Sequence, residues 1–528
     1  MTTFLRALRM NIFSTVSLFV ALGCILAPQA ATAQPIPTFI NGLELGDTNI
    51  GRSAIAVQRT CKELIDTGFN ADPSATTSGA ELWRRCNELV ATANSINTGT
   101  QAGRTLGYTA DEDLLAAFQQ VNGEETMAQS SLAQNGTYEQ FSSVGARLGA
   151  LRGASSASVT SVAANGTDFM YGSGGGAAAD DAPFGPWGWF IRGTYASGDR
   201  DPSDPNGFVG EENGFDFDQY GLTLGVDHTS GSRVWGVAVS YSSYDLDMQT
   251  LGAAAGAASN TDRVNDGTIE SDSVTGTVYF DYTSDSDVYF SALGGFGGQS
   301  FDLARSFIYV PTCTTTCGTD VVTQRRTLVG APDGDSQAAT LSLGRMVQRG
   351  SWVIDPHIGV TYDNVTIDQF AESDTGNASG DGIQGLDAMQ LMFDEQEIKS
   401  LRATLGIQFS KNVNTSFGSV RPTFSVDWHH EFEDDPRELK VKYVLEDDLV
   451  GAPVVVPGQE NTFALGFDCT VSCFSLFSEA PDSDFFVVGA GVAASYRSGL
   501  QAFLMLEGLV GYDDLSTYAL TIGLRGQF

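Results

Sequence analysis

The chain has 528 residues, of which 64 are acidic and 28 are basic, so its formal net charge is −36. An excess of acidic residues this large argues against a nucleic-acid partner, because DNA and RNA both bind proteins through a cationic surface. The 60 glycines and 32 phenylalanines favour many closely paired strands with aromatic contacts over long helices.

The first 33 residues have the parts of a secretory signal peptide. Two arginines give a positive start, an apolar run follows over residues 12–26, and a small-residue motif ends at Ala33. We therefore expect cleavage between Ala33 and Gln34. Cys24 hints at a lipoprotein signal instead, but the apolar run continues past it, so this alternative is disfavoured. No later window holds about 20 uninterrupted apolar residues, so no transmembrane helix is predicted.

Six cysteines follow the predicted cleavage site, and an even number in an exported protein favours disulfides over free buried thiols. The six are Cys61, Cys86, Cys313, Cys317, Cys469 and Cys473. The first two lie on the apolar stripes of neighbouring predicted helices, where a disulfide would staple a small helical hairpin. Each of the other two pairs, in CTTTC and CTVSC, is expected to close a small loop. Metal binding by these pairs would require their loops to touch, and we expect no metal.

Residues 49–152 carry apolar side chains at helical spacing, which predicts four helices. The first ends at Gly68, the second begins at Ser78 with capping-box spacing, and the third is capped by Thr109. The fourth covers residues 124–152 and is rich in Ala, Ser, Gln and Gly. A helix this slim and polar can thread a narrow water-filled space. A flexible Gly/Ala/Ser linker follows it.

From Trp187 onward the period of the apolar residues changes to two, which predicts strands. The clearest example runs from Val420 to Phe432, where apolar side chains fall on one face and charged or hydroxyl side chains on the other. We predict twelve strands, at residues 187–198, 215–228, 233–246, 268–282, 287–303, 336–348, 351–367, 396–410, 418–432, 485–496, 500–512 and 516–528.

Three features favour a membrane barrel over a soluble sandwich. The apolar face often ends in aromatic residues, as a membrane-interface girdle requires. These are Trp187, Trp189, Tyr195, Tyr241, Tyr282, Trp352, Tyr362, Trp428, Tyr496 and Tyr512. The polar face carries more charges than a dry core accepts. These are Arg192, Asp227, Asp281, Asp355, Arg402, Asp427, Glu507 and Arg525. Short and long connections also alternate, as in outer-membrane barrels, and an even number of strands closes the sheet.

This arrangement of signal peptide, passenger, slim helix, linker and barrel resembles the autotransporters (type V secretion) of Gram-negative bacteria. The resemblance implies an outer-membrane location, contact with lipid and insertion by the barrel-assembly machinery, and we expect a monomer. That machinery reads a final aromatic residue with apolar residues at alternate positions before it. The matching residues are Leu520, Ile522, Leu524 and Phe528. Gly526 departs from the pattern, because a bulky residue is usual there.

The segment QFSSVGARLGALR, residues 140–152, is similar to the pore helix of self-cleaving autotransporters. Those proteins carry an Asn-Asn dyad where this chain has Ser142-Ser143. Asparagine cyclisation is therefore not available, and we expect the passenger to stay uncleaved. The expected contacts join Arg147 and Arg152 of the helix to acidic lumen groups such as Asp427 or Glu507. The alternative is that the two arginines only solvate the helix.

The sequence contains no nucleophile elbow, no H-E-x-x-H motif and no phosphate loop. His429 and His430, with the acids that follow them, are the one catalytic candidate, since omptin-like proteases use Asp and His at a barrel rim. Alternation directs His429 to the lumen and His430 to the lipid, so the two cannot easily share a substrate. The long connections are strongly acidic, which fits solvated loops better than a calcium site, because no ordered ligand spacing is present.

The predicted organisation is a signal peptide (1–33), a helical passenger domain (34–123), a pore helix (124–152), a flexible linker (153–186) and an outer-membrane barrel (187–528). We expect the barrel to translocate and display the passenger for adhesion or surface interaction, with no enzymatic activity and no cofactor. Two alternatives remain open. One is an outer-membrane channel with a periplasmic N-terminal domain, and the other is a rim-site surface hydrolase that uses His429.

Overall fold

A computed structural model describes most of the chain after the predicted signal peptide. The described residues are 35–66, 68, 78–100, 103–129, 141, 144–145, 147–149, 186–202, 214–248, 267–309, 311–313, 324–377, 389–444, 473–496 and 499–528. The predicted cleavage site and nearly all of the predicted linker lie outside these residues. Residues 35–528 form one compact unit.

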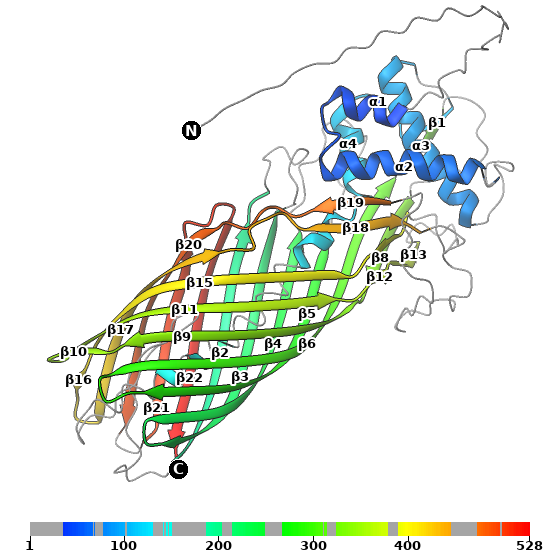
Figure 1. The fold of residues 1–528 in the computed structure, drawn as a ribbon. Helices are drawn as coiled ribbons and strands as arrows, with labels where there is room; N and C mark the ends of the chain where they lie inside the picture. Colours follow the sequence, from blue (N-terminus) through cyan, green and yellow to red (C-terminus); the bar gives the residue numbers. More distant parts are fainter. Residues whose placement is uncertain are drawn as a thin grey trace, which may run out of the picture. The chain divides into compact units, whose positions relative to one another are not determined.

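Twelve antiparallel strands form a closed barrel, in which each strand pairs with the next along the chain (Figure 1). They are β2 (Trp187–Arg200), β3 (Phe215–Ser230), β4 (Arg233–Met248), β5 (Thr268–Thr283), β6 (Val288–Tyr309), β9 (Asp333–Arg345), β11 (Trp352–Ile367), β15 (Gln396–Lys411), β17 (Gly418–Glu431), β20 (Asp484–Tyr496), β21 (Gln501–Val510) and β22 (Leu515–Gln527). The first strand pairs with the last, from Gly188 opposite Gln527 to Arg200 opposite Leu515. The barrel therefore has no free edge, and all twelve predicted strands are confirmed. The largest difference is at β6, which continues to Tyr309 rather than residue 303.

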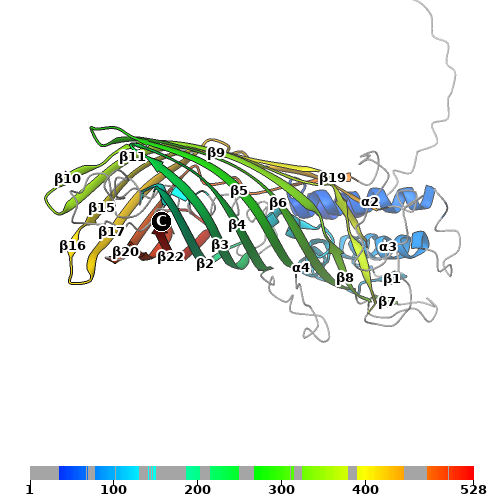
Figure 2. The same cartoon turned by 90° about the horizontal axis from the view of Figure 1, so that it is seen from below.

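The alternation along β4 shows how these residues form a membrane-facing wall. Val237 and Val239 lie on the outer face with 51% and 58% of their surface exposed. Ser240 and Ser242 turn inward, are buried, and make hydroxyl contacts with neighbouring strands. An apolar exterior around a polar interior is the reverse of a soluble barrel, and it suits lipid outside and water inside. Figure 2 shows the strands lying side by side at a tilt to the barrel axis, as barrel closure requires.

Short and long connections alternate around the barrel as predicted, except that only residues 511–514 join β21 to β22, the last connection, which was also expected to be short. At one end, two residues join β3 to β4, and residues 284–287 join β5 to β6. At this end the short strands β10 (Val347–Arg349) and β16 (Val413–Asn414) extend the hairpins. The long connections leave from the opposite end and carry further strands, including β8 (Gln324–Gly330) and β13 (Ser373–Asn377), which continue the sheet beside β6. Outer-membrane barrels turn their short connections to the periplasm.

Two of the long connections build a small sheet that the sequence analysis missed. Its strands are β12 (Phe370–Ala371), β14 (Leu391–Phe393), β18 (Glu438–Tyr443) and β19 (Cys473–Phe477), paired in that order. The expectation that these connections are only solvated loops is wrong for these strands, because Phe393, Val441 and Leu476 are fully buried. Each strand is too short for a period of two to stand out in the sequence.

The N-terminal part is helical, as predicted. Its elements are α1 (Pro35–Gly42), α2 (Asn49–Asp66), α3 (Ser78–Thr98), α4 (Asp111–Gln119) and the 3₁₀-helix η1 (Glu124–Ala128), with the short strand β1 (Arg104–Thr105) before α4. Helix α1 was not predicted, and the predicted cap at Thr109 is wrong, because Ala110 is the N-cap of α4 and no side chain caps it. No helix that the structure describes has both the length and the apolar composition needed to cross a membrane.

The predicted disulfide between Cys61 and Cys86 is present and joins α2 to α3, with 5.7 Å between the Cα atoms. Cys473 is also disulfide-bonded. Cys317 and Cys469 lie outside the described residues, so the predicted closure of each loop by its own cysteine pair stays a prediction. Cys313 ends β7 (Thr312–Cys313), which pairs with β1 of the helical part.

The helices and the four-stranded sheet bury their apolar faces in one shared core. Helix residues of this core include Ile50, Leu64, Leu89 and Phe118, and sheet residues include Leu391, Phe393, Val441 and Leu476. Asn49 makes two hydrogen bonds to the backbone of Phe477, one as donor at 2.9 Å and one as acceptor at 2.8 Å. The Tyr443 hydroxyl donates to the Val121 carbonyl at 3.2 Å. The helical part alone is small, so the sheet supplies a large part of its core.

Candidate functional site: the barrel lumen and the helix inside it

The described residues between 141 and 149 are helical, and they lie inside the barrel. Phe141, Val144 and Leu148 are buried against apolar residues that point inward from the strands. These strand residues are Phe190, Val234, Ala238, Tyr279, Leu293 and Ala338. Gly295 makes room for the helix, because a Cβ atom there would lie 2.9 Å from the Phe141 ring. The predicted slim helix therefore packs at a defined position in the lumen, which we call its seat. Side chains of the helix and of the strands both fit this position.

Arg147 fixes this helix to the barrel wall through a buried bidentate ion pair. Its Nε lies 2.5 Å from Asp227 Oδ2, and its Nη2 lies 2.8 Å from Asp227 Oδ1. The Tyr279 hydroxyl donates to Asp227 Oδ2 at 3.3 Å. Gly188 is needed beside this pair, because a Cβ atom there would lie 2.0 Å from Arg147 Nη2. The planar guanidinium matches a carboxylate in this geometry, so the pair fixes both the position of the helix along the barrel axis and its rotation.

The predicted partners of the pore helix need correction. Arg147 does pair with an acidic group of the lumen, but that group is Asp227 rather than Asp427 or Glu507. Asp427 instead faces His357, whose Nε2 lies 2.9 Å from Asp427 Oδ1 across the strand that carries Gly406. Arg152, the second predicted contact, lies outside the described residues, as do Ser142 and Ser143. The sequence showed which face of each strand is polar, but it contained no signal for how far the helix enters the lumen.

The inner wall around the helix is polar and charged, as the alternation predicted. All eight charged residues assigned to the lumen are at most 9% exposed. Neighbouring side chains bind several of these carboxylates: Ser291 donates to Asp281 at 2.7 Å, and Tyr289 donates to Asp355 at 3.2 Å. Gly406 leaves the space for the His357–Asp427 contact, because a Cβ atom there would lie 1.7 Å from Asp427 Oδ1. The lumen is therefore a hydrogen-bonded interior that can bind a helix.

A second buried network joins η1 to the long connections at the other end of the lumen. Arg305 forms a bidentate ion pair with Glu372, donates to the Gln120 carbonyl at 2.8 Å and donates to the Met389 carbonyl at 3.2 Å. Glu125 lies in the same region, and its burial raises the pKa of its carboxyl group, an effect that the nearby Arg305 partly opposes. Further along, Gln396 Nε2 donates to Gln129 Oε1 at 3.1 Å. These contacts hold the chain just before it enters the lumen.

The two rim histidines point to opposite faces of β17, as predicted. His429 is fully buried, and its Nδ1 lies 3.1 Å from Thr404 Oγ1. His430 lies on the outer face, where its Nδ1 is 3.0 Å from Asp484 Oδ1 and its ring stacks on Trp428. Within the described ranges, no group of three His, Cys, Asp or Glu side chains is arranged to hold a metal ion. The rim therefore offers no shared site for the two histidines.

The last strand explains why Gly526 departs from the expected pattern. Leu520, Ile522 and Leu524 face outward, and Phe528 is 64% exposed. Trp189 lies opposite Gly526 in the β2–β22 pairing, and a Cβ atom on this glycine would lie 2.8 Å from the indole Nε1. The neighbouring strand thus supplies the bulk that the last strand lacks. The role of the four residues in barrel assembly stays a prediction.

A family model for the autotransporter beta-domain matches residues 189–472, which is more than half of the chain. No curated protein matches the chain. The fold is similar to the translocator domain of the autotransporter NalP from Neisseria meningitidis, at 12% identity and a TM-score of 0.42, over 66% of this chain and 91% of that one. It is similar to the beta domain of the Bordetella autotransporter BrkA, at 15% identity and a TM-score of 0.37, over 65% of this chain and 100% of that one.

A third similar structure is the Ralstonia pickettii toluene transporter TbuX, at 11% identity and a TM-score of 0.38, over 67% of this chain and 91% of that one. Identities and scores this low carry no functional argument, and the family assignment rests on the match of the family model to the barrel strands. The chain belongs to the autotransporter family, and its autotransporter beta-domain forms a twelve-stranded barrel in the outer membrane.

Proposed function

We propose that the barrel translocates the N-terminal helical domain and then holds it at the cell surface for adhesion or another surface interaction, without catalysis. The path of the chain through the lumen carries this proposal. Gln129 is bonded to Gln396, the first residue of β15, at the end with the long connections. Arg147 is bonded to Asp227, three residues before the last residue of β3, which the short turn follows. Because long connections of such barrels face the outside, this path favours an extracellular position for the helices.

The shared core supports retention of the helical domain over its release. The helices pack on strands of the long connections, and Asn49 bonds both backbone groups of Phe477. Arg52 adds a donor to the Ser475 carbonyl at 2.8 Å and lies 4.4 Å from the centre of the Phe477 ring. Strand pairing between β1 and β7 adds a third contact. A domain that shares a core with its own translocator is expected to stay attached even if the linking chain were cut.

The path through the lumen disfavours the channel alternative, because the helix occupies the space that a solute would need. The rim hydrolase has little support, since His429 is buried and His430 faces outward. The proposal also includes that the protein is a monomer, that the barrel-assembly machinery inserts it, and that the displayed domain has a ligand outside the cell.

Two epitope insertions test the proposed position of the helical domain. The first follows Glu44, an exposed residue between α1 and α2. The matched control is inserted in the exposed turn at Gly231, between β3 and β4. We expect an antibody to bind the Glu44 tag on intact cells and the Gly231 tag only after permeabilisation. The opposite pattern would assign the helical domain to the periplasm and leave the channel alternative. A shortened tagged chain on a denaturing gel would contradict the uncleaved passenger.

A further inference from the structure

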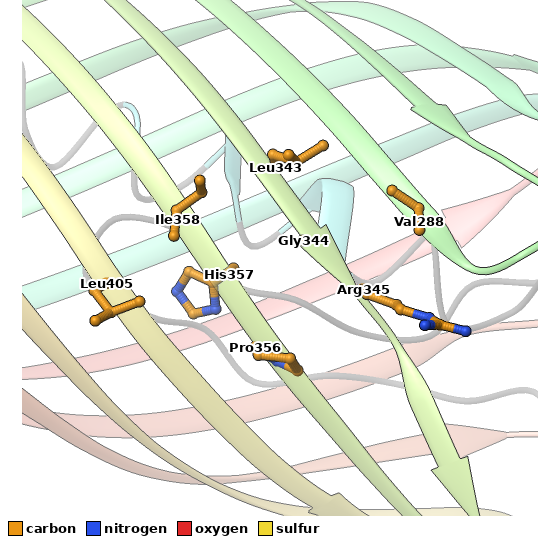
Figure 3. Close-up of a pocket in the computed structure, with 8 residues that line it drawn as sticks. All are labelled: Val288, Leu343, Gly344, Arg345, Pro356, His357, Ile358 and Leu405. Atoms are coloured by element: carbon orange, nitrogen blue, oxygen red, sulfur yellow. The ribbon is translucent and has the colours of Figure 1, made fainter.

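The outer wall of the barrel has a shallow depression near its short-turn end, with a volume of about 260 Å³. Leu343, Ile358 and Leu405 form a row across three neighbouring strands on one side of it. Val288 and Pro356 line the side toward the short turns. Figure 3 shows these residues, with Arg345 on the side away from Leu405. The depression is smaller than the ~300–1,000 Å³ of common small-molecule pockets, and it opens onto the membrane-facing wall.

The depression has a floor without outward side chains. Gly344 and His357 are paired across β9 and β11, and the His357 side chain turns into the lumen toward Asp427. Gly344 has no side chain because the Tyr289 ring packs against it from inside, where a Cβ atom would lie 2.3 Å from the hydroxyl. Pro356 adds only a short, rigid ring on the outer face. Contacts inside the barrel therefore determine the depth of the depression, and this depth does not depend on what covers the outer surface.

Arg345 provides a cation at the short-turn edge of this apolar depression. It lies opposite Val288, the first residue of β6, and the next residue, Met346, donates a backbone hydrogen bond to the Asp287 carbonyl. Arg345 is exposed and has no ion-pair partner among the residues that the structure describes. Trp352 is also exposed on the outer face nearby, as expected of a residue at the membrane interface.

The charges on the outside of the barrel are unevenly distributed between its two ends. Most exposed cations of the barrel strands and their hairpin extensions lie at the short-turn end, namely Arg233, Arg345, Arg349 and Lys411. Lys399 is the exception, since it lies at the opposite end, where it pairs with Glu397. Exposed acids gather at the end with the long connections, for example Asp216, Asp247, Glu270, Asp333 and Glu397. The chain has a net charge of −36, so a group of exposed cations at one end of the barrel is not what its overall composition would produce. A basic position beside an apolar groove at the membrane surface suits an anionic lipid headgroup.

We infer that this depression binds one anionic phospholipid of the periplasmic leaflet, with an acyl chain in the apolar groove and its phosphate on Arg345. The inference does not depend on the side of the membrane that the helical domain occupies, since the site lies entirely on the barrel wall. Asp285 and Asp287 lie in the adjacent turn, and their negative charges would repel the phosphate. The competing assignment is therefore that Arg345 only offsets these two carboxylates.

Native mass spectrometry of the full-length protein in detergent tests the inference. Phosphatidylglycerol is compared with phosphatidylcholine at equal concentration, so that headgroup charge and general lipid binding are separated. We expect Arg345→Gln to weaken retention of phosphatidylglycerol about fivefold, the effect of one cation near an anionic lipid surface, and to weaken phosphatidylcholine less, because the choline cation offsets the charge of its phosphate. Arg233→Gln, at an exposed arginine of the same end but outside the depression, is the matched control and should change neither.

A second variant tests the groove itself. Val288→Trp keeps Arg345 and fills the depression, so it should reduce retention of both lipids, with Val288→Phe as a smaller substitution of the same kind. Heat-modifiable gel mobility checks that every variant has a folded barrel. Equal retention by Arg345→Gln and Arg233→Gln would overturn the headgroup contact. Unchanged retention in both Val288 variants, or a dimer that they abolish, would assign the depression to something other than lipid.

Discussion

Loss of the Arg147 guanidinium should release the helix from its seat in the lumen. In Arg147→Met, the buried Asp227 carboxylate keeps only the 3.3 Å contact from Tyr279 among its hydrogen bonds to side chains described above. Removal of one partner from a buried ion pair costs about 3–5 kcal/mol. We take the lower limit of about 3 kcal/mol, which is roughly a hundredfold in the ratio of unseated to seated helix.

Conductance of the full-length protein in planar bilayers measures this ratio, since a helix that leaves its seat opens the lumen to ions. We expect Arg147→Met to increase the time spent in open states by roughly that factor, and Arg349→Met, at an exposed arginine outside the lumen, to behave as wild type. Adding Asp227→Asn to Arg147→Met removes the unpaired charge and should restore most of the closed time. If Arg147→Met conducts like wild type, the ion pair does not hold the helix. If the double variant is as open as the single one, lost packing and not charge explains the effect.

Three further predictions concern the helical domain and its shared core. Burial raises the pKa of Glu125, so the folded state binds its proton more tightly than the unfolded state, and this contribution to stability is lost as pH rises above the ordinary carboxyl value. Glu125→Gln should therefore resist protease better than wild type at pH 8, with a smaller advantage at pH 5, and an equal advantage at both would contradict this. Val441→Asp places an unpaired charge in the shared core and should make residues 35–129 protease-sensitive without loss of barrel heat-modifiability, whereas Lys440→Asp, on the exposed face of β18, should not. The disulfide between Cys61 and Cys86 closes a 25-residue separation, so Cys61→Ser should destabilise the helical domain by roughly 3 kcal/mol, measurable as a lower midpoint in urea.

The barrel could be predicted strand by strand because its signal is local. In a membrane-spanning strand, every second side chain meets lipid and every other one meets the lumen, so a short window such as Val420 to Phe432 reports both the strand and its two faces. The apolar stripes of α2 and α3 are local in the same way, and they brought Cys61 and Cys86 together correctly. The strands of the small sheet could not be predicted in this way, since they are only two to six residues long and are buried by contacts with distant segments.

The sequence alone determined the strand number, the inner and outer faces of the barrel, the alternation of connections and the existence of a slim helix before the barrel. Only the tertiary structure decided that Arg147 meets Asp227, that the helices share a core with the long connections, and that Trp189 covers Gly526. The reason is that a face depends on neighbours two residues apart, whereas Arg147 and Asp227 are 80 residues apart. Their contact depends on how far the helix enters the barrel and how it is rotated, and that is set by the fit of side chains from many strands at once.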